Sequence, residues 1–535
     1  MKVKRLAAAL FLVLAMMVNI VGCGGGDNAA KDAGGDKEKI FVFARSGDAS
    51  GLDPINVTDG ESLYVTQQIF DTLLEYADDS TDLQPGLATE WESAKDGKEW
   101  TLKLREGVKF HDGTPFNAEA VKFNFDRWRD EKHPNHQGDF SYYTYMFGGF
   151  PGIIQDVAAV DEYTVKFVLT QPQAPFLANL AMATFGISSP EAVKQHGEDY
   201  FKNPVGTGPF KFVKWEKDQQ VVVEKNAEYW GEKAKVDKIV FRTIPDNSAR
   251  LMELQSGTID GMIGLNPDDV ETIKNDANLQ LLMRPSMNVG YLAMNTEKDF
   301  LKEQKIRQAI NHAVNKQALI DAFYAGLAKP AKNPMPPSLW GYNDEVKGYE
   351  YDPAKAKALL AEAGYPDGFE TTLWAMPVAR PYMPQPKEIA QAIQQDLAKV
   401  GITTKIVTYD WQTYIEKGEN AEHDLYLFGW TGDNGDPDNF LYVLLDKSNT
   451  VKGSAGNVAF YKNDRVSSLL VDAQKESDQS KRDKLYKDAQ VLINEDAPWV
   501  PLVHSTPPIA AKKSISGWLP HATGTECFVG VDKAE

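Results

Sequence analysis

An acidic residue and an arginine, each in an apolar and aromatic segment, are the side chains of this sequence best suited to binding chemistry. Asp433 closes the segment 429–433, which reads Gly-Trp-Thr-Gly-Asp and follows the apolar run 425–428. Arg380 lies among the apolar and aromatic residues 374–382. A strand that ends in a glycine-rich loop is a common ligand position in α/β folds, because the loop offers free backbone amides. Taken alone, Asp433 could instead form a turn or a helix cap, and Arg380 a surface ion pair.

The usual signatures of enzymes are absent from the sequence. It has no Gly-x-Ser-x-Gly, no His-Glu-x-x-His and no phosphate-binding Walker loop. The Gly-Thr-Gly of 206–208 precedes Pro209, which lacks an amide for a phosphate, so a turn into a strand is expected there. His133 and His136 are expected in a solvated loop, and residues 433–438 lack the glutamate that closes a calcium loop. We therefore expect a binding protein without a metal or another cofactor.

The composition describes an ordinary globular protein with an acidic surface. The chain has 535 residues, a formal net charge of −19, 42% hydrophobic and 25% charged residues, and two cysteines. This length exceeds what one hydrophobic core usually supports, so we expect two or three lobes. The acidic balance disfavours phosphate backbones and hence nucleic-acid binding. Two cysteines cannot form a disulfide framework, and no function is assigned to Cys527.

The N-terminus reads as the signal peptide of a bacterial lipoprotein. A basic start leads into the apolar run 6–18, too short to span a bilayer, and then into Ile-Val-Gly before Cys23. This lipobox predicts that residues 1–22 are cleaved and that the Cys23 thiol carries a lipid. The alternatives are an ordinary secretory signal or a Cys23 without a role. Cleavage removes three basic and no acidic residues, which leaves 513 residues with a charge of −22. The glycine-rich stretch 23–39 is expected to be a flexible tether.

Irregularly alternating strands and helices predict an α/β or α+β organisation. Alternation and short apolar runs predict strands at 40–44, 100–104, 108–110, 165–169, 220–223, 238–244, 402–408 and 425–428. Helices are expected at 118–129, from the Asp352-Pro353 cap to Gly364, and from Ile389 to Val400 before Gly401. No Pro- or Gly-rich linker interrupts the body, so lobes must be joined by short connections or by more than one crossing.

Several segments resemble one protein family. Similarity to the extracytoplasmic solute-binding proteins of bacterial peptide ABC transporters, family 5, is carried by 87–113, 203–210, 288–292 and 340–344. Residues 374–382 and 429–440, which contain Arg380 and Asp433, resemble the dipeptide-binding branch of that family. The resemblance extends over nearly all of the chain that follows the signal peptide.

This resemblance implies a periplasmic-binding-protein-like α/β fold of type II, with two lobes and a hinge. Lobe I would comprise residues 40–285 and 501–535, and lobe II residues 286–500. The lobes would close around a dipeptide or similar small peptide and deliver it to the membrane permease and ATPase subunits of an importer. The implied protein is a monomer without enzymatic activity, and its lipid anchors it at a membrane outside the cytoplasm.

The resemblance also implies roles for individual residues. Asp433 would pair with the α-ammonium of the peptide and Arg380 with its α-carboxylate, since a guanidinium can hold a carboxylate through two parallel hydrogen bonds. The distance between these charges would then select peptide length. Backbone groups of Gly429 and Thr431 would pair with the peptide main chain as an added strand. The remaining expected contacts are Trp430 from the pocket wall and Thr58, Asp59 and Gly60 from the facing lobe.

Other solutes remain open within the same fold. The segment 444–460 lacks the cysteines of the familiar dipeptide binder, so the side-chain preference is undetermined. Glutathione, haem, or a nickel or other metal chelate are alternatives, although Arg380 favours a compact ligand with a terminal carboxylate. His423 and His504 are expected to be structural. A secreted peptide hydrolase is a remote alternative.

Overall fold

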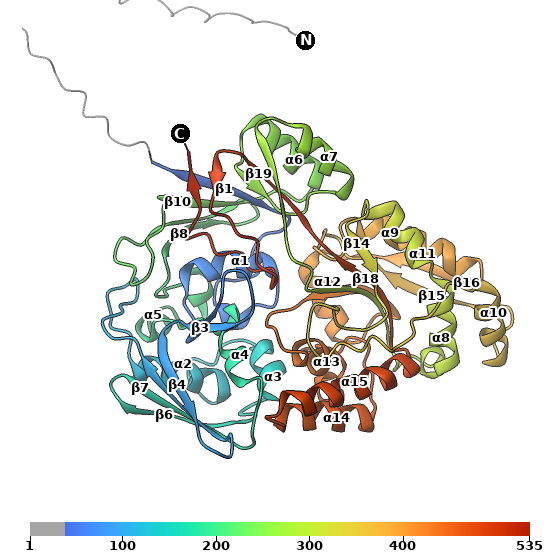
Figure 1. Ribbon diagram of the computed structural model, residues 1–535, viewed down its shortest axis with the longest axis horizontal. Helices are drawn as coiled ribbons and strands as arrows, with labels where there is room; N and C mark the ends of the chain where they lie inside the picture. The colour runs from blue at the N-terminus through green and yellow to red at the C-terminus, as the bar shows by residue number, and fades with distance from the viewer. Residues whose placement is uncertain (1–37, 535) are drawn as a thin grey trace, which may run out of the picture. The chain divides into compact units, whose positions relative to one another are not determined.

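The computed structural model describes residues 38–534 (Figure 1). The expected signal peptide 1–22, Cys23 and all but the last two residues of the expected tether therefore lie outside the described residues. Among residues 38–534, no helix is both long enough and apolar enough to cross a bilayer. The described chain is a mixed α/β structure built on three larger sheets and two small ones.

The three larger sheets contain strands that are distant in sequence. The seven-stranded sheet has the order β12 (Leu279–Met283), β19 (Pro508–Lys512), β11 (Gly261–Met262), β1 (Ile40–Arg45), β10 (Lys238–Thr243), β9 (Gln220–Lys225), β8 (Phe210–Glu216). The six-stranded sheet has the order β14 (Ala328–Pro330), β18 (Trp499–Ser505), β13 (Asn288–Met294), β17 (Leu425–Thr431), β15 (Phe369–Trp374), β16 (Ile402–Val407). The four-stranded sheet has the order β4 (Ala88–Ser93), β5 (Glu99–Leu104), β7 (Thr164–Leu169), β6 (Ile154–Asp161).

Two small antiparallel pairs complete the strands. They are β2 (Leu74–Tyr76) with β3 (Leu83–Pro85), and β20 (Ile515–Ser516) with β21 (Asp532–Lys533). Parallel and antiparallel pairings occur in the same sheet: β1 is parallel to β10, whereas β10 is antiparallel to β9.

Helices cover these sheets. In chain order they are α1 (Gly60–Ile69), α2 (Ala118–Arg129), α3 (Ser141–Phe147), α4 (Phe176–Leu180), α5 (Pro190–His196), α6 (Asn247–Ser256), α7 (Val270–Asn275), α8 (Gln304–Ala313), α9 (Lys316–Phe323), α10 (Pro353–Glu362), α11 (Pro386–Ala398), α12 (Trp411–Glu419), α13 (Asp438–Leu445), α14 (Asp464–Lys475) and α15 (Gln479–Asp496). α1 packs on β8 and β9, α2 packs on β6 and β7, and α11 packs on β15 and β16. The seven-stranded sheet has an aromatic core in which the rings of Phe41, Phe43, Trp518 and Phe528 are in mutual contact.

The chain passes between the seven-stranded and the six-stranded sheet at two short connections. β12 ends at Met283 and β13 begins at Asn288, whereas β18 ends at Ser505 and β19 begins at Pro508. β18 and β19 are the long red strands of Figure 1. Short connections were one of the two arrangements predicted from the absence of a Pro- or Gly-rich linker in the sequence. The lobe boundaries themselves stay a prediction, and β18 continues within the six-stranded sheet to Ser505, beyond the expected start of the last segment of lobe I at 501.

All but one of the expected strands and helices are found. The structure has strands or helices at 40–44, 100–104, 118–129, 165–169, 220–223, 238–243, 353–362, 386–398 and 402–407. The strand expected at 108–110 is wrong, because Lys109 forms only an isolated bridge to Pro115. Across this bridge Phe110 donates to Thr114 and Phe116 donates to Val108, with a turn at 111–113 between them, and the chain then enters the Asn117 cap of α2, so no longer ladder forms. β5 pairs with β4 and β7.

Candidate ligand-binding cavity

All eight residues expected at the ligand site line one cavity of about 130 Å³. They come from three separate parts of the chain: Thr58, Asp59 and Gly60 at the start of α1, Arg380 after β15, and Gly429, Trp430, Thr431 and Asp433 at and just after the end of β17. Further walls are provided by α3, α12 and the segment 523–525. The structure therefore brings together segments that are more than 300 residues apart, and their ligand roles remain a prediction.

Asp433 is a carboxylate held by neutral donors. Its Oδ1 accepts a hydrogen bond from the Tyr142 hydroxyl at 3.0 Å, and its Oδ2 accepts one from Nδ2 of Asn439 at 3.0 Å. Within residues 38–534 no lysine or arginine forms an ion pair with it. Burial raises the pKa of Asp433 to about 7, which the hydrogen bonds from Asn439 and Tyr142 offset only in part. A cation placed against this carboxylate would supply the charge that its surroundings lack.

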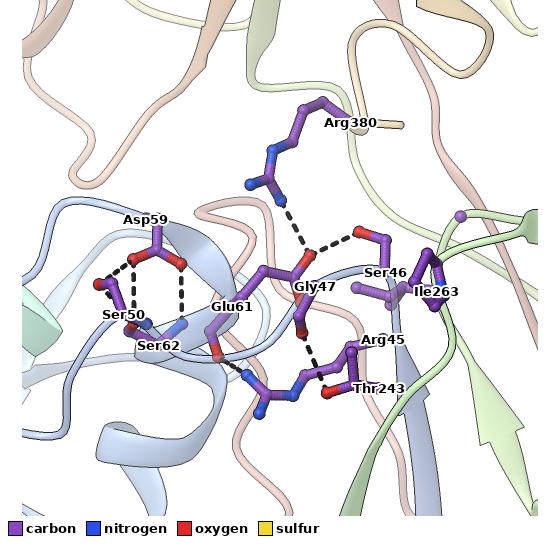
Figure 2. A network of polar contacts seen from close by, with 12 residues as sticks. Arg45, Ser46, Gly47, Ser50, Asp59, Glu61, Ser62, Thr243, Ile263 and Arg380 are labelled. Carbon is purple, nitrogen blue, oxygen red and sulfur yellow. Dashed lines mark hydrogen bonds and ion pairs between the residues drawn. The ribbon is translucent and has the colours of Figure 1, made fainter. Parts of the chain in front are cut away.

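Arg380 has one paired and one unpaired nitrogen. Its Nη1 donates to Oε1 of Glu61 at 2.9 Å (Figure 2). The guanidinium carbon lies 4.2 Å from the centre of the Trp411 ring. Its Nη2 is buried and has no hydrogen-bond acceptor among the described residues. Because the backbone of Arg380 also pairs with that of Met383 in both directions, the side chain starts from a tight turn. One face of the guanidinium is fixed, and one donor remains for a ligand.

The start of α1 forms part of the cavity wall, and the Asp59 carboxylate there caps the helix. The carboxylate of Asp59 caps the helix: Oδ1 accepts from the Ser62 amide at 3.1 Å, and Oδ2 accepts from the hydroxyls of Ser50 at 2.7 Å and Ser62 at 2.9 Å (Figure 2). Aspartate is a preferred residue at this position because it satisfies amides that the first turn leaves free. The carboxylate of Asp59 thus accepts three hydrogen bonds within the protein, and the segment also lines the cavity through Thr58 and Gly60.

The segment 429–431 is the end of a strand, which corrects the expectation of a loop there. Thr431, Trp430 and Gly429 pair with residues 288–290 of β13. On the other side, β15 pairs with β17 only at Leu425 and Tyr426. Beyond Tyr426, that side of β17 has no strand partner among the described residues and borders the cavity. A strand edge of this kind can accept an extended peptide.

Several residues of the site were not expected from the sequence. They are Glu61, Tyr142, Tyr145, Trp411, Glu419 and Asn439. Glu61 directly follows the expected segment 58–60, and Asn439 lies inside the resemblance at 429–440, so these two had a signal nearby. Nothing in the sequence distinguishes Tyr142 from the other tyrosines of α3. The structure places His423 and His504 outside the cavity, each buried and bonded to a backbone carbonyl.

Comparison with known proteins identifies the family. The family model described as "Bacterial extracellular solute-binding proteins, family 5 Middle" matches residues 82–452. This chain belongs to that family. The family consists of binding proteins that act outside the cytoplasm. Membership of this chain agrees with its fold and with the resemblance seen in its sequence.

Relatives within family 5 are named after different ligands. The chain is 41% identical over 506 residues to the dipeptide-binding protein of Escherichia coli K12, covering 92% of this chain and 94% of the relative. It is 39% identical over 547 residues to heme-binding protein A of Haemophilus influenzae, covering 98% and 99%. The solved structure of the periplasmic binding protein DppA from Helicobacter pylori, in complex with the peptide STSA, superposes with a TM-score of 0.87 at 39% identity, covering 93% and 99%. Overall similarity alone therefore does not select the solute.

Proposed function

We propose that this chain is the extracytoplasmic receptor of a peptide ABC importer and that it captures dipeptides. The observation that carries the proposal is a pair of uncompensated groups in one cavity: among residues 38–534, Asp433 has no counter-charge and Nη2 of Arg380 has no acceptor. A free-ended peptide supplies an ammonium for the first and a carboxylate for the second. Leaving either group unpaired in a closed site costs several kcal/mol, so a ligand with both ends gains most.

The main chain of the peptide would lie along β17. The side of this strand beyond Tyr426 has no strand partner among the described residues, and Gly429 lacks a side chain that would stand between the strand and its neighbours. Main-chain hydrogen bonds do not depend on the side chains of the ligand, so this mode is suited to peptides of varied sequence. Trp430 would form a wall of the pocket, and residues 58–60 would contact the peptide from the opposite side.

Capture would proceed by closure of two lobes. We assign residues 40–285 and the chain after Ser505 to one lobe and 286–505 to the other, which moves the expected boundary at 501 to the end of β18, with the hinge at the two connections between the seven-stranded and six-stranded sheets. The loaded receptor would meet the permease and ATPase subunits as a monomer, held at the membrane by a lipid on Cys23. The receptor would bind without catalysing a reaction.

Calorimetry with a dipeptide panel tests this function. Copurified ligand is first removed by unfolding and refolding, and Ala-Ala is titrated beside N-acetyl-Ala-Ala and Ala-Ala-amide. Binding of Ala-Ala with large losses for both blocked peptides is expected. No binding of any free-ended dipeptide by refolded protein would overturn the proposal.

Haem is the alternative ligand that a relative's name suggests, and its binding can be measured separately. The described cavity lining contains no histidine, cysteine or methionine; its possible iron ligands are tyrosines, of which Tyr142 and Tyr145 already donate hydrogen bonds to Asp433 and Glu419. Titration with haem, followed in the visible absorption spectrum, should give no saturable band. Tripeptides and glutathione in the same calorimetric panel measure how strictly the distance from Asp433 to Arg380 limits the ligand.

A further inference from the structure

Glu419, the last residue of α12, is a carboxylate in the ligand cavity with no charged partner. Its one hydrogen bond from a side chain within residues 38–534 comes from the Tyr145 hydroxyl, at a long 3.5 Å from Oε1. No lysine or arginine of the described chain forms an ion pair with it. Burial raises the pKa of Glu419 to about 8, and the charges nearest to it, on Asp139 and Glu416, are themselves acidic. Glu419, like Asp433, is therefore a cavity carboxylate that has no ion-pair partner within residues 38–534.

The position of Glu419 along the cavity follows from two helices. Arg380 stacks on Trp411 at the start of α12, and Glu419 lies eight residues later, about 12 Å along the helix axis. On α3, the rings of Tyr142 and Tyr145 are 6.0 Å apart. Tyr142 donates to Asp433, and its neighbour Tyr145 donates to Glu419. Glu419 thus lies near Asp433 and far from Arg380.

We propose that Glu419 determines side-chain specificity by pairing with a basic side chain on the first residue of the peptide. The proposal rests on the function proposed above, because the ammonium at Asp433 places the first residue beside α3. The cavity wall around Glu419 includes Ile415, Ala455 and Val458, which suit the methylene groups of a lysine or arginine side chain. The charged end of that side chain then meets a carboxylate that the free protein leaves without a counter-ion.

A neighbouring cavity is the rival location for such a side chain. It has a volume of about 390 Å³ and shares Tyr142 and Asp433 with the ligand cavity. Its lining among the described residues contains no lysine or arginine but four further carboxylates, those of Asp71, Glu75, Asp78 and Glu232. Substitution of Glu419 separates the two locations, because Glu419 lines only the first of these two cavities.

The test compares dipeptides that differ by one charge. Lys-Ala, norleucine-Ala, Ala-Lys and Ala-Ala are titrated calorimetrically into the wild type, Glu419→Gln and the control Glu416→Gln, which removes an exposed carboxylate from the same helix. In the wild type and in Glu416→Gln, Lys-Ala should bind about 10- to 100-fold more tightly than norleucine-Ala, the range expected for a charge-assisted hydrogen bond. In Glu419→Gln this preference should disappear, whereas Glu416→Gln should bind Ala-Ala within about twofold of the wild type.

Each outcome decides the inference separately from the proposed function. Equal binding of Lys-Ala and norleucine-Ala by the wild type would overturn the role of Glu419 and leave dipeptide capture intact. A lysine preference that survives in Glu419→Gln would also overturn it and assign the side chain to the neighbouring cavity. A preference for Ala-Lys over Lys-Ala would reverse the proposed orientation and contradict the inference. If Ala-Ala itself fails to bind, the proposed function falls, and this inference falls with it.

Discussion

Nη1 of Arg380 donates to Oε1 of Glu61 at 2.9 Å, and this ion pair connects the segment after β15 to the first turn of α1. Glu61 is fully buried, and the same oxygen accepts a hydrogen bond from the Ser46 hydroxyl at 2.6 Å. Glu61 thereby fixes the plane of the guanidinium while Nη2 stays unpaired. We infer that Glu61 is a positioning residue: it lets Arg380 receive the carboxylate of a ligand without first breaking an existing bond.

Removing the charge of Asp433 should abolish most of the affinity that a peptide gains from its free amino end. Asp433→Asn is expected to weaken Ala-Ala binding about 100-fold, because the ammonium would be buried beside a neutral amide. Calorimetry measures the loss, and the exposed Asp79→Asn serves as the control. N-acetylation of the peptide should weaken its binding to the wild type by a similar factor. It should weaken binding to Asp433→Asn only slightly further. Additive losses would show that Asp433 and the ammonium do not interact.

Binding of Ala-Ala should weaken as the pH falls through about 7. Free Asp433 has a pKa of about 7 and takes up a proton below that pH, whereas a bound ammonium lowers the pKa and keeps the carboxylate charged. Binding therefore releases a proton in acid, and the affinity drops by up to about tenfold per pH unit below the free pKa. The termini of the peptide do not titrate between about pH 5 and 7.

Calorimetry in buffers of different ionisation enthalpy measures this proton release. Because Glu419 has a raised pKa of about 8 and lies in the same cavity, the series is repeated with Glu419→Gln. The acid weakening should persist there and vanish in Asp433→Asn. An affinity for Ala-Ala that is constant from about pH 5.5 to 8 would contradict a titrating Asp433.

Replacing Arg380 by lysine should separate charge from geometry. Arg380→Lys keeps the cation but loses the planar donors and the stacking on Trp411, so Ala-Ala should bind about tenfold more weakly. Ala-Ala-amide should bind both proteins with nearly equal, low affinity. The exposed Arg465→Lys is the control. A loss for the amide as large as that for the free acid would argue that Arg380 does not contact the carboxylate.

Gly429 should tolerate no side chain. A Cβ at this position would lie 2.3 Å from the Tyr382 ring and 2.5 Å from the carbonyl oxygen of Val289, which belongs to the paired strand β13. Gly429→Ala is therefore expected to lower the free energy of unfolding by about 1–3 kcal/mol and to reduce peptide binding. Gly60→Ala, whose Cβ would meet no atom within 4 Å, should unfold like the wild type. Thermal denaturation of the ligand-free proteins provides the comparison, and equal stability would contradict the close contact.

Local signals in the sequence predict most elements, whereas the contacts of the site depend on distant segments. Asp352 and Pro353 predict the start of α10, and in the structure Asp352 accepts from the Lys355 amide at 2.9 Å. Such a cap involves residues three apart, so it is visible in a short window. The pairing of Arg380 with Glu61 involves residues 319 apart, and no periodicity encodes it.

The errors at 108–110 and 429–431 have different origins. Val108 and Phe110 are buried as a strand pattern requires, yet the chain turns back at 111–113 and reaches the cap of α2 at Asn117, which leaves a single bridge. Glycine and threonine at 429 and 431 suggest a loop, yet β13 lies alongside and makes them strand. That neighbour is remote in sequence, and composition alone does not reveal it.

The unpaired side of β17 also bears on the behaviour of the protein in a crowded compartment. An exposed strand edge is a template on which other chains can add and aggregate. Here that edge faces a cavity walled by α3, α12 and the start of α1, so a folded protein or a long strand cannot lie against it. The cavity admits only a segment short enough to fit between its walls. In this arrangement of the lobes, the same enclosure that limits the length of the peptide would thus protect the receptor from pairing with its own copies.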